Sequence, residues 1–163
     1  FFSVNLYAES IFQQIALAQK GKGERDVAVR EVKRFWSSVG VDTLGWILMD
    51  GSGLSALNAI SPEQMGKVLF YMANTSKSSD AFMQSLPKAG KEGTVYWFGK
   101  NTALENNAQL KSGSFTGTLC YSGYITTQSN KRLAFSIMMN RYEGEMRGAA
   151  KKLLPILERV ATY

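Results

Sequence analysis

The stretch that decides the fold is residues 110–140, LKSGSFTGTLCYSGYITTQSNKRLAFSIMMN. Apolar residues alternate with other residues in its last part, as in a β-strand with one buried face: Leu133, Phe135, Ile137 and Met139. We therefore predict strands over residues 109–115, 118–126 and 132–139, with QSNKR at 128–132 as the hairpin turn between the last two. The sequence predicts an antiparallel meander.

The rest of the chain is mainly helical in its periodicity. Helices are predicted over residues 5–19, 24–38, 61–74, 79–86 and 145–161. Ser61 and Pro62 are typical of a helix start, and Pro155 predicts a kink. A short apolar strand is predicted at 46–49. Helices followed by a meander and a last helix indicate an α/β (α+β) fold, with residues 1–92 mainly helical and residues 93–163 forming the sheet and its last helix.

Composition excludes several kinds of catalytic site. The 163 residues are 45% apolar, which suits one globular domain, and there is no long apolar run to span a membrane. There is no histidine, so a Ser-His-Asp triad, a Cys-His pair and a His-ligated metal are excluded. The one cysteine, Cys120, lies in a strand-like apolar run and is interpreted as a small hydrophobic residue. Lysine, tyrosine or a carboxylate must therefore carry any acid-base chemistry near neutral pH.

The net charge of +6 favours anionic partners in general. The lysines and arginines are nevertheless scattered in short groups along the chain, without a basic stripe interleaved with aromatic residues. We interpret them as a solvated surface and expect no nucleic-acid partner.

The Lys-Ser-Gly triplet at 111–113 carries the candidate chemistry. On a strand, Lys111 and Gly113 point to one face, and Ser112 and Ser114 point to the other. Because Gly113 has no side chain, a ligand backbone can lie beside the Lys111 ammonium and pair with the strand edge. The serine hydroxyls can hold a carboxylate. The triplet alone is also compatible with a surface turn.

Three phrases occur in a defined order: SVNLYAES from Ser3, DGSGLSALNAISP from Asp50, and LKSGSFTGTLCYSGYI from Leu110. Together with FMQSLPKAGKEGT and RLAFSI, this order resembles the penicillin-recognising serine D-Ala-D-Ala carboxypeptidases, specifically the class C low-molecular-mass penicillin-binding proteins. The resemblance covers essentially the whole chain. It implies a β-lactamase/transpeptidase-like fold, an antiparallel sheet with flanking helices, of which this chain is the C-terminal part.

The resemblance also implies roles in catalysis. Ser3 would relay a proton between the lysine of the site and the leaving-group nitrogen. Asn5 would hydrogen-bond the peptide carbonyl of the substrate. Lys111 would stabilise charge near Ser3. No metal or cofactor is implied.

For substrate binding, the resemblance assigns the terminal carboxylate of the substrate to Ser112 and half of the oxyanion hole to the Ser114 backbone N–H. Gly113 would leave the docking slot open. Two positions depart from the family pattern: the triplet is Lys-Ser-Gly where the family has Lys-Thr-Gly, and Ala56 stands where the family often has arginine. Serine keeps the hydroxyl, whereas any ionic contact made at the second position is in doubt.

The family nucleophile belongs to a Ser-x-x-Lys motif placed well before the Ser-x-Asn motif, and only Phe1 and Phe2 precede Ser3. One Ser-x-x-Lys, SLPK at 85–88, is interpreted as a chance match in a loop. The chain is therefore expected to be the C-terminal segment of a longer enzyme and to be inactive alone. Its sheet is expected to have an open edge, at which a second copy of the chain or the rest of a larger protein packs.

The expected function is that of a serine-type D-Ala-D-Ala carboxypeptidase, with endopeptidase activity also considered. It would act through an acyl-enzyme on peptidoglycan peptides ending in D-Ala-D-Ala. β-Lactams would be further ligands, and the location would be the periplasm or cell envelope. One alternative is a non-catalytic peptidoglycan-binding or scaffolding relative. Another is a β-lactamase or esterase on the same scaffold.

Overall fold

The computed structural model describes all 163 residues except for the side chain of Lys20. The chain divides into two compact units. The helical unit comprises Ser3–Val68, and the sheet unit comprises Phe1–Phe2 with Leu69–Tyr163. Each unit has its own cluster of buried apolar side chains.

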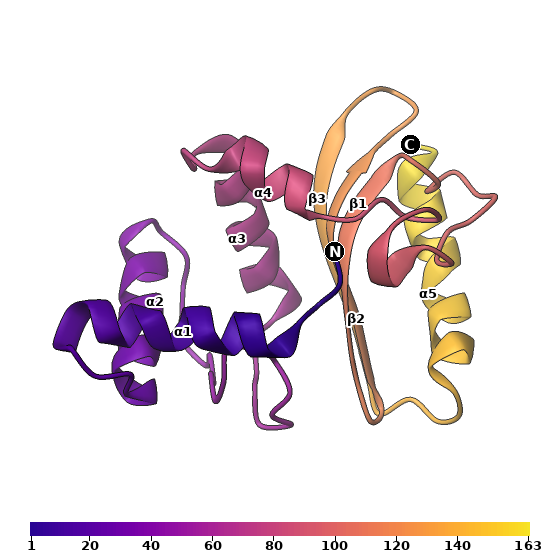
Figure 1. The fold of residues 1–163 in the computed structure, drawn as a ribbon. Helices are drawn as coiled ribbons and strands as arrows, with labels where there is room; N and C mark the ends of the chain where they lie inside the picture. Colours follow the sequence, from indigo (N-terminus) through magenta and orange to yellow (C-terminus); the bar gives the residue numbers. More distant parts are fainter. The chain divides into compact units, whose positions relative to one another are not determined.

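Two helices that pack against each other build the core of the helical unit, α1 (Asn5–Lys20) and α2 (Arg25–Ser38) (Figure 1). Their apolar faces meet in one buried cluster: Phe12, Ala16, Val27 and Ala28. Helix α1 ends at Gly21, which has a left-handed φ of 68° and donates its backbone N–H to the Leu17 carbonyl at 2.8 Å. The predicted helices at 5–19 and 24–38 are confirmed.

The strand predicted at 46–49 is wrong, because only an isolated bridge forms there, between Ile47 and Ala59. The pairing stops because the chain turns at once around Asp50. The Asp50 carboxylate accepts the backbone N–H of Leu54 at 3.2 Å and that of Ser55 at 2.7 Å. A carboxylate that collects several backbone donors favours a compact loop over an extended strand.

Helix α3 (Pro62–Asn74) begins as predicted. Ser61 Oγ accepts the Gln64 backbone N–H at 3.1 Å, and Gln64 Oε1 accepts the Ser61 backbone N–H at 2.9 Å. This reciprocal pair is a capping box. The short helix α4 (Ser79–Ser85) follows and confirms the helix predicted at 79–86.

The sheet unit contains three antiparallel strands in the order β1-β2-β3. They are β1 (Ala108–Phe115), β2 (Thr118–Thr126) and β3 (Arg132–Asn140). The predicted meander is therefore confirmed, with ends that differ by at most one residue. Strands β1 and β3 are the two edges of this sheet.

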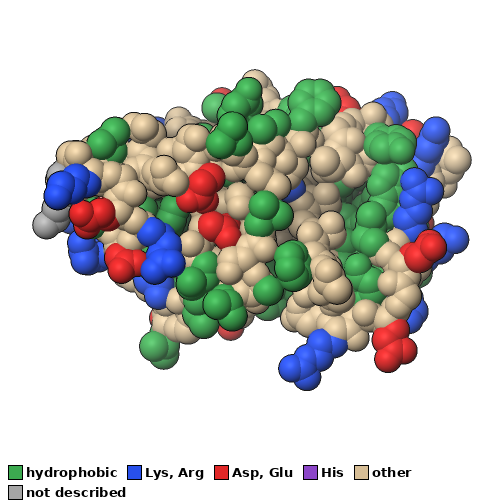
Figure 2. Space-filling model, turned by 60° about the horizontal axis from the view of Figure 1, so that its bottom comes forward, with side chains coloured by type: hydrophobic (Ala, Val, Ile, Leu, Met, Phe, Trp, Pro, Cys, Tyr) green, Lys and Arg blue, Asp and Glu red, His purple; other side chains and the backbone are tan. Residues whose placement is uncertain are grey.

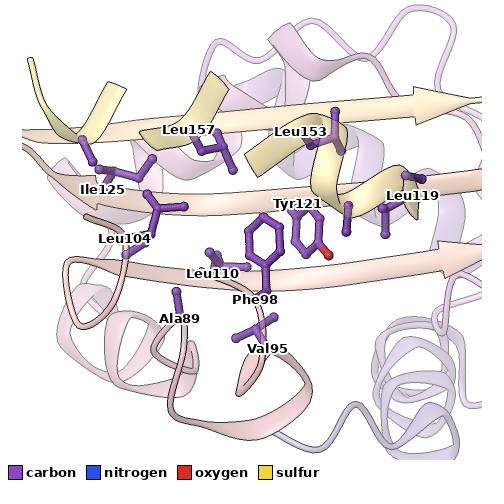
Figure 3. Close-up of a cluster of buried hydrophobic side chains, with 14 residues drawn as sticks. Ala89, Val95, Phe98, Leu104, Leu110, Leu119, Tyr121, Ile125, Leu153 and Leu157 are labelled. Carbon is purple, nitrogen blue, oxygen red and sulfur yellow. The ribbon is translucent and has the colours of Figure 1, made fainter. Parts of the chain in front are cut away.

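Helix α5 (Met146–Ala161) covers one face of the sheet (Figure 1). Apolar side chains from the sheet, from α5 and from the segment before β1 form the core between them (Figure 3). At its centre the Phe98 and Tyr121 rings stack with centroids 4.0 Å apart. Pro155 lies inside α5, and the kink there stays a prediction.

The opposite face of the sheet receives the end of α3 and helix α4. The Tyr124 hydroxyl donates to the Leu69 carbonyl at 2.7 Å, and the Phe82 ring meets the Tyr124 ring edge-on with centroids 6.5 Å apart. The sheet unit therefore has helices on both faces of an antiparallel sheet, which confirms the predicted fold class.

The described helices include none that is both long enough and apolar enough to cross a membrane. Lysine and arginine side chains appear in separate groups on the face shown in Figure 2. This distribution agrees with the scattered basic residues of the sequence.

Candidate active site

The Lys-Ser-Gly triplet lies on edge strand β1, where the register defines its neighbours. Ser122 stands opposite Lys111, and Cys120 stands opposite Gly113. A Cβ added at Gly113 would meet no atom within 4 Å, so the space beside this glycine is open in the structure. The predicted docking slot stays a prediction, and no protein atom lies where a side chain at Gly113 would begin.

Lys111 is the predicted cation of this slot. The residue as a whole is exposed, and the ammonium donates a hydrogen bond to the backbone carbonyl of Ser112. Surrounding protein atoms nevertheless remove part of its hydration, and this desolvation lowers the pKa of Lys111 below 10.5. An ammonium with reduced hydration interacts more strongly with an anionic ligand than a fully solvated one.

The backbone groups on the outer edge of β1 are hydrogen-bonded as far as Leu110 and lack backbone partners beyond it. The Leu110 N–H donates to the Pro87 carbonyl at 3.0 Å, and the Ala108 carbonyl accepts the Ala89 N–H at 2.9 Å. Backbone groups alternate in direction along a strand, so the N–H groups of Ser112 and Ser114 also face this edge. Among the described residues, neither has a backbone partner there. These two unpaired N–H groups are the kind that an extended peptide pairs with when it adds to a sheet edge.

The Ser112 side chain points away from the Lys111 face. Its hydroxyl lies 3.0 Å from the hydroxyl of Thr94, which belongs to the short 3-10 helix η1 (Gly93–Val95). Sequence reasoning missed Thr94. Its hydroxyl is paired with Ser112 across 18 residues of chain, and no local spacing signals this contact.

A second pair that the sequence did not indicate lies on the Lys111 face. The Ser122 and Ser136 hydroxyls are 2.9 Å apart and occupy directly paired positions on β2 and β3. Lys111, Ser122 and Ser136 thus form one polar row across the three strands. The strands themselves were predictable from the alternation of apolar residues. The polar row was not, because it depends on which residues pair across neighbouring strands.

Ser3 and Asn5 belong to the helical unit, whereas Lys111, Ser112, Gly113 and Ser114 belong to the sheet unit. The predicted proximity of the Ser3 hydroxyl to the Lys111 amine therefore stays a prediction. Ser3 has a φ of 54°, which is uncommon for a residue with a side chain, and it lies just before α1. Backbone strain of this kind clusters at functional sites.

Two of the recognised phrases contact each other within the helical unit. The Glu9 carboxylate of NLYAE accepts the backbone N–H of Gly51 of DGSG at 2.7 Å. A Cβ at Gly51 would come within 2.4 Å of the Phe12 Cβ. The DGSG loop is therefore held against the helix that Asn5 begins.

The SLPK match does not have the geometry of a catalytic Ser-x-x-Lys. Helix α4 ends at Ser85, so Lys88 does not follow on the next helical turn. The Ser85 hydroxyl donates to the Phe82 carbonyl at 2.7 Å. These contacts support the interpretation of a chance match.

Cys120 is half-buried, and burial raises the pKa of its thiol. A raised pKa disfavours the thiolate, which is the nucleophilic form. This agrees with the interpretation of Cys120 as a small hydrophobic residue.

The antiparallel sheet with helices on both faces matches the fold of solved penicillin-binding-protein and β-lactamase structures. Penicillin-binding protein 4 (dacB) from Haemophilus influenzae has a solved structure that is 27% identical with a TM-score of 0.89, covering 99% of this chain and 38% of that one. Another structure of the same protein contains a β-lactam. The TLA-1 β-lactamase structure shares the fold, at 17% identity and a TM-score of 0.62, covering 94% of this chain and 62% of that one.

The sequence comparisons define the family. The D-Ala-D-Ala carboxypeptidase 3 (S13) family matches residues 2–159, and the chain belongs to this family. It is 32% identical to the D-alanyl-D-alanine carboxypeptidase of Actinomadura sp. (strain R39), over 99% of this chain and 30% of that protein. The chain spans about a third of the length of this relative and of the Haemophilus influenzae protein.

Proposed function

We propose that the whole protein is a serine-type D-Ala-D-Ala carboxypeptidase that cleaves peptidoglycan stem peptides through an acyl-enzyme. One observation carries the proposal. In a chain of the S13 family, Lys111 stands beside an open space at Gly113, on an edge strand whose Ser112 and Ser114 N–H groups have no backbone partner among the described residues. A peptide tail ending in D-alanine has the extended backbone and terminal carboxylate that such a slot can bind.

In this proposal the substrate backbone lies along β1. The Ser114 N–H, which faces the free edge, donates to the acyl oxygen as negative charge develops on it. The Ser112 hydroxyl donates to the terminal carboxylate of the substrate. Lys111, on the other face of β1, supplies a positive charge to the site, and this charge interacts more strongly with an anion where water is partly excluded.

Ser3 and Asn5 complete the proposed site. Ser3 relays the proton to the leaving-group nitrogen, and Asn5 hydrogen-bonds the substrate's peptide carbonyl. The nucleophile is the serine of a Ser-x-x-Lys motif in the whole protein, where the lysine one helical turn later acts as base. Residues 1–163 then form the C-terminal part of the transpeptidase-like domain.

The location and further partners follow from the substrate. Peptidoglycan lies outside the cytoplasmic membrane, so we propose a periplasmic or cell-envelope location. β-Lactams would acylate the same nucleophile, in line with the β-lactam complex of the Haemophilus influenzae protein. Pairing of two copies through the edge of β3 is a further proposal, which sedimentation of the whole protein tests.

Labelled penicillin and release of D-alanine from an acyl-D-Ala-D-Ala peptide test the function. In the whole protein, Lys111→Ala should reduce the acylation rate at least about a hundredfold, as the loss of a strong electrostatic contact does in comparable sites. Lys131→Ala removes an exposed lysine in the turn before β3 and is the matched control. A near-normal acylation rate in Lys111→Ala would contradict the assigned role. Binding of peptidoglycan without labelling or D-alanine release would identify the scaffolding alternative.

A further inference from the structure

A groove of about 700 Å³ runs along α2 in the helical unit. One wall is a single face of α2 that extends from Arg25 to Ser37, and the other wall is the segment from Trp46 to Met49. Its size falls in the range typical of ligand sites. None of the six candidate site residues lines this groove.

The charged residues of the α2 wall are four cations, Arg25, Arg30, Lys33 and Arg34, and one acid, Asp26. Arg25 pairs with Asp26 at 3.0 Å, and Arg34 pairs with Glu31. The Lys33 ammonium donates to the Trp46 carbonyl at 2.6 Å.

Within the described side chains, Arg30 alone of these cations has neither an ion pair nor a hydrogen-bond partner. An exposed, unpaired guanidinium in a wall of net positive charge favours an anionic ligand group.

The opposite wall is apolar. Trp46 is 5% exposed, and its indole N–H is buried without an acceptor among the described atoms. Ile47 is 48% exposed, although its side chain is one of the larger apolar ones. A ligand that only neutralised the cations would leave this apolar wall in water. The groove therefore suits a ligand with both acidic and apolar groups.

The backbone of this wall offers a further contact. Ile47 directs both its N–H and its carbonyl to Ala59, at 3.0 and 2.9 Å. Leu48 follows Ile47 outside any strand, on the same wall as the Trp46 carbonyl that meets Lys33 of α2. The Leu48 N–H and carbonyl have no partner among the described residues. One residue of an extended chain can pair with them.

We propose that this groove binds an extended peptide segment with alternating acidic and apolar side chains. The acidic side chains meet Arg30 and its neighbours, the apolar ones cover Ile47, and the peptide backbone pairs with Leu48. The stretch of α2 from Arg25 to Ser37 is about 18 Å long, which matches about six extended residues. A polyanion such as polyphosphate fits less well because it has no group for the apolar wall.

Fluorescence anisotropy of a labelled hexapeptide of alternating glutamate and leucine tests this with the whole protein. We expect saturable binding that weakens as salt rises, since the contact is partly ionic. Arg30→Glu should weaken binding about tenfold or more. The matched control Lys22→Glu makes the same charge change at an exposed residue outside the groove and should leave binding unchanged. Labelling by penicillin should be unchanged in both variants, which separates this proposal from the enzymatic one.

Three results would overturn the proposal. If Arg30→Glu and Lys22→Glu weakened peptide binding equally, the binding would depend on the net charge of the protein and not on the groove. Unchanged binding in Ile47→Ser, with full displacement by polyphosphate, would assign the groove to anions alone. Absence of binding by the whole protein would show that the groove does not take such a peptide.

Discussion

The Thr94 hydroxyl lies 3.0 Å from the Ser112 hydroxyl, on the face of β1 opposite Lys111. A serine hydroxyl has one proton to donate and two lone pairs that accept. If Thr94 donates to Ser112, the Ser112 proton is free to donate to a substrate carboxylate. Thr94 would then be a positioning residue that acts through Ser112.

Replacing Thr94 with valine in the whole protein should therefore impair recognition of the carboxylate. Without Thr94 as donor, the Ser112 hydroxyl is no longer held with its proton toward the carboxylate. We expect kcat/KM for a peptide with a free C-terminal carboxylate to fall about tenfold, while kcat/KM for the C-terminal amide changes little. Thr94→Ser keeps the hydroxyl and should restore the preference. An equal fall for both substrates would show that Thr94 has only a structural role.

Gly113 and Gly123 lie on neighbouring strands but should respond differently to a side chain. A Cβ at Gly113 meets no atom within 4 Å, so Gly113→Val should fold with nearly unchanged stability, since valine suits a strand. The new side chain occupies the proposed substrate slot. We expect acylation by labelled penicillin to slow by at least tenfold, as judged from the rate of labelling. Labelling at the normal rate in a stable Gly113→Val protein would exclude this slot.

Gly123 provides the contrasting case. A Cβ there would come within 2.1 Å of the Gln109 carbonyl oxygen and 2.6 Å of the Leu110 Cα, and both are backbone atoms that cannot move independently. Gly123→Ala should lower the free energy of unfolding by about 3 kcal/mol through overpacking. Urea denaturation followed by circular dichroism measures this change. An unchanged denaturation midpoint would mean that β1 and β2 accommodate the added methyl group without loss of stability.

The sequence was sufficient where the signal is local. The strands around residues 110–140 and the helix start at Ser61 follow from alternation and capping, which neighbouring residues determine. The predicted strand at 46–49 had the apolar character of a strand, but the Asp50 loop ended its pairing after one bridge. Thr94 and the Ser122–Ser136 pair depend on contacts between distant residues, and periodicity does not encode these.

The Glu9–Gly51 contact predicts a stability effect within the helical unit. The carboxylate accepts the Gly51 N–H at 2.7 Å, a charge-assisted hydrogen bond across 42 residues. Glu9→Ala should lower the free energy of unfolding by about 2 kcal/mol, since the Gly51 N–H loses its acceptor. Glu9→Gln keeps a carbonyl oxygen and should cost less. The order of the two denaturation midpoints checks this, and equal midpoints would show that the negative charge is the essential feature.

The lowered pKa of Lys111 predicts the alkaline limit of the reaction. Burial disfavours the charged amine, so Lys111 loses its proton at a lower pH than a free lysine at 10.5. Acylation that needs the ammonium should therefore decline as pH rises through this lowered pKa, below 10.5. In Lys111→Arg the positive charge persists, and the alkaline decline should move to higher pH even if the maximal rate is lower.

The lowered pKa of Lys111 affects stability in the opposite direction from the rate: as pH rises, the rate falls and the free energy of unfolding increases. Between the lowered pKa and 10.5 the unfolded chain holds more protons on Lys111 than the folded chain, so the free energy of unfolding contributed by this group rises with pH. Lys111→Met removes this titration. The difference in the free energy of unfolding between the wild type and Lys111→Met, measured in urea, should therefore change with pH only in that window.

For the alkaline limit of the rate, parallel pH–rate profiles of the wild type and Lys111→Arg would show that another group sets it.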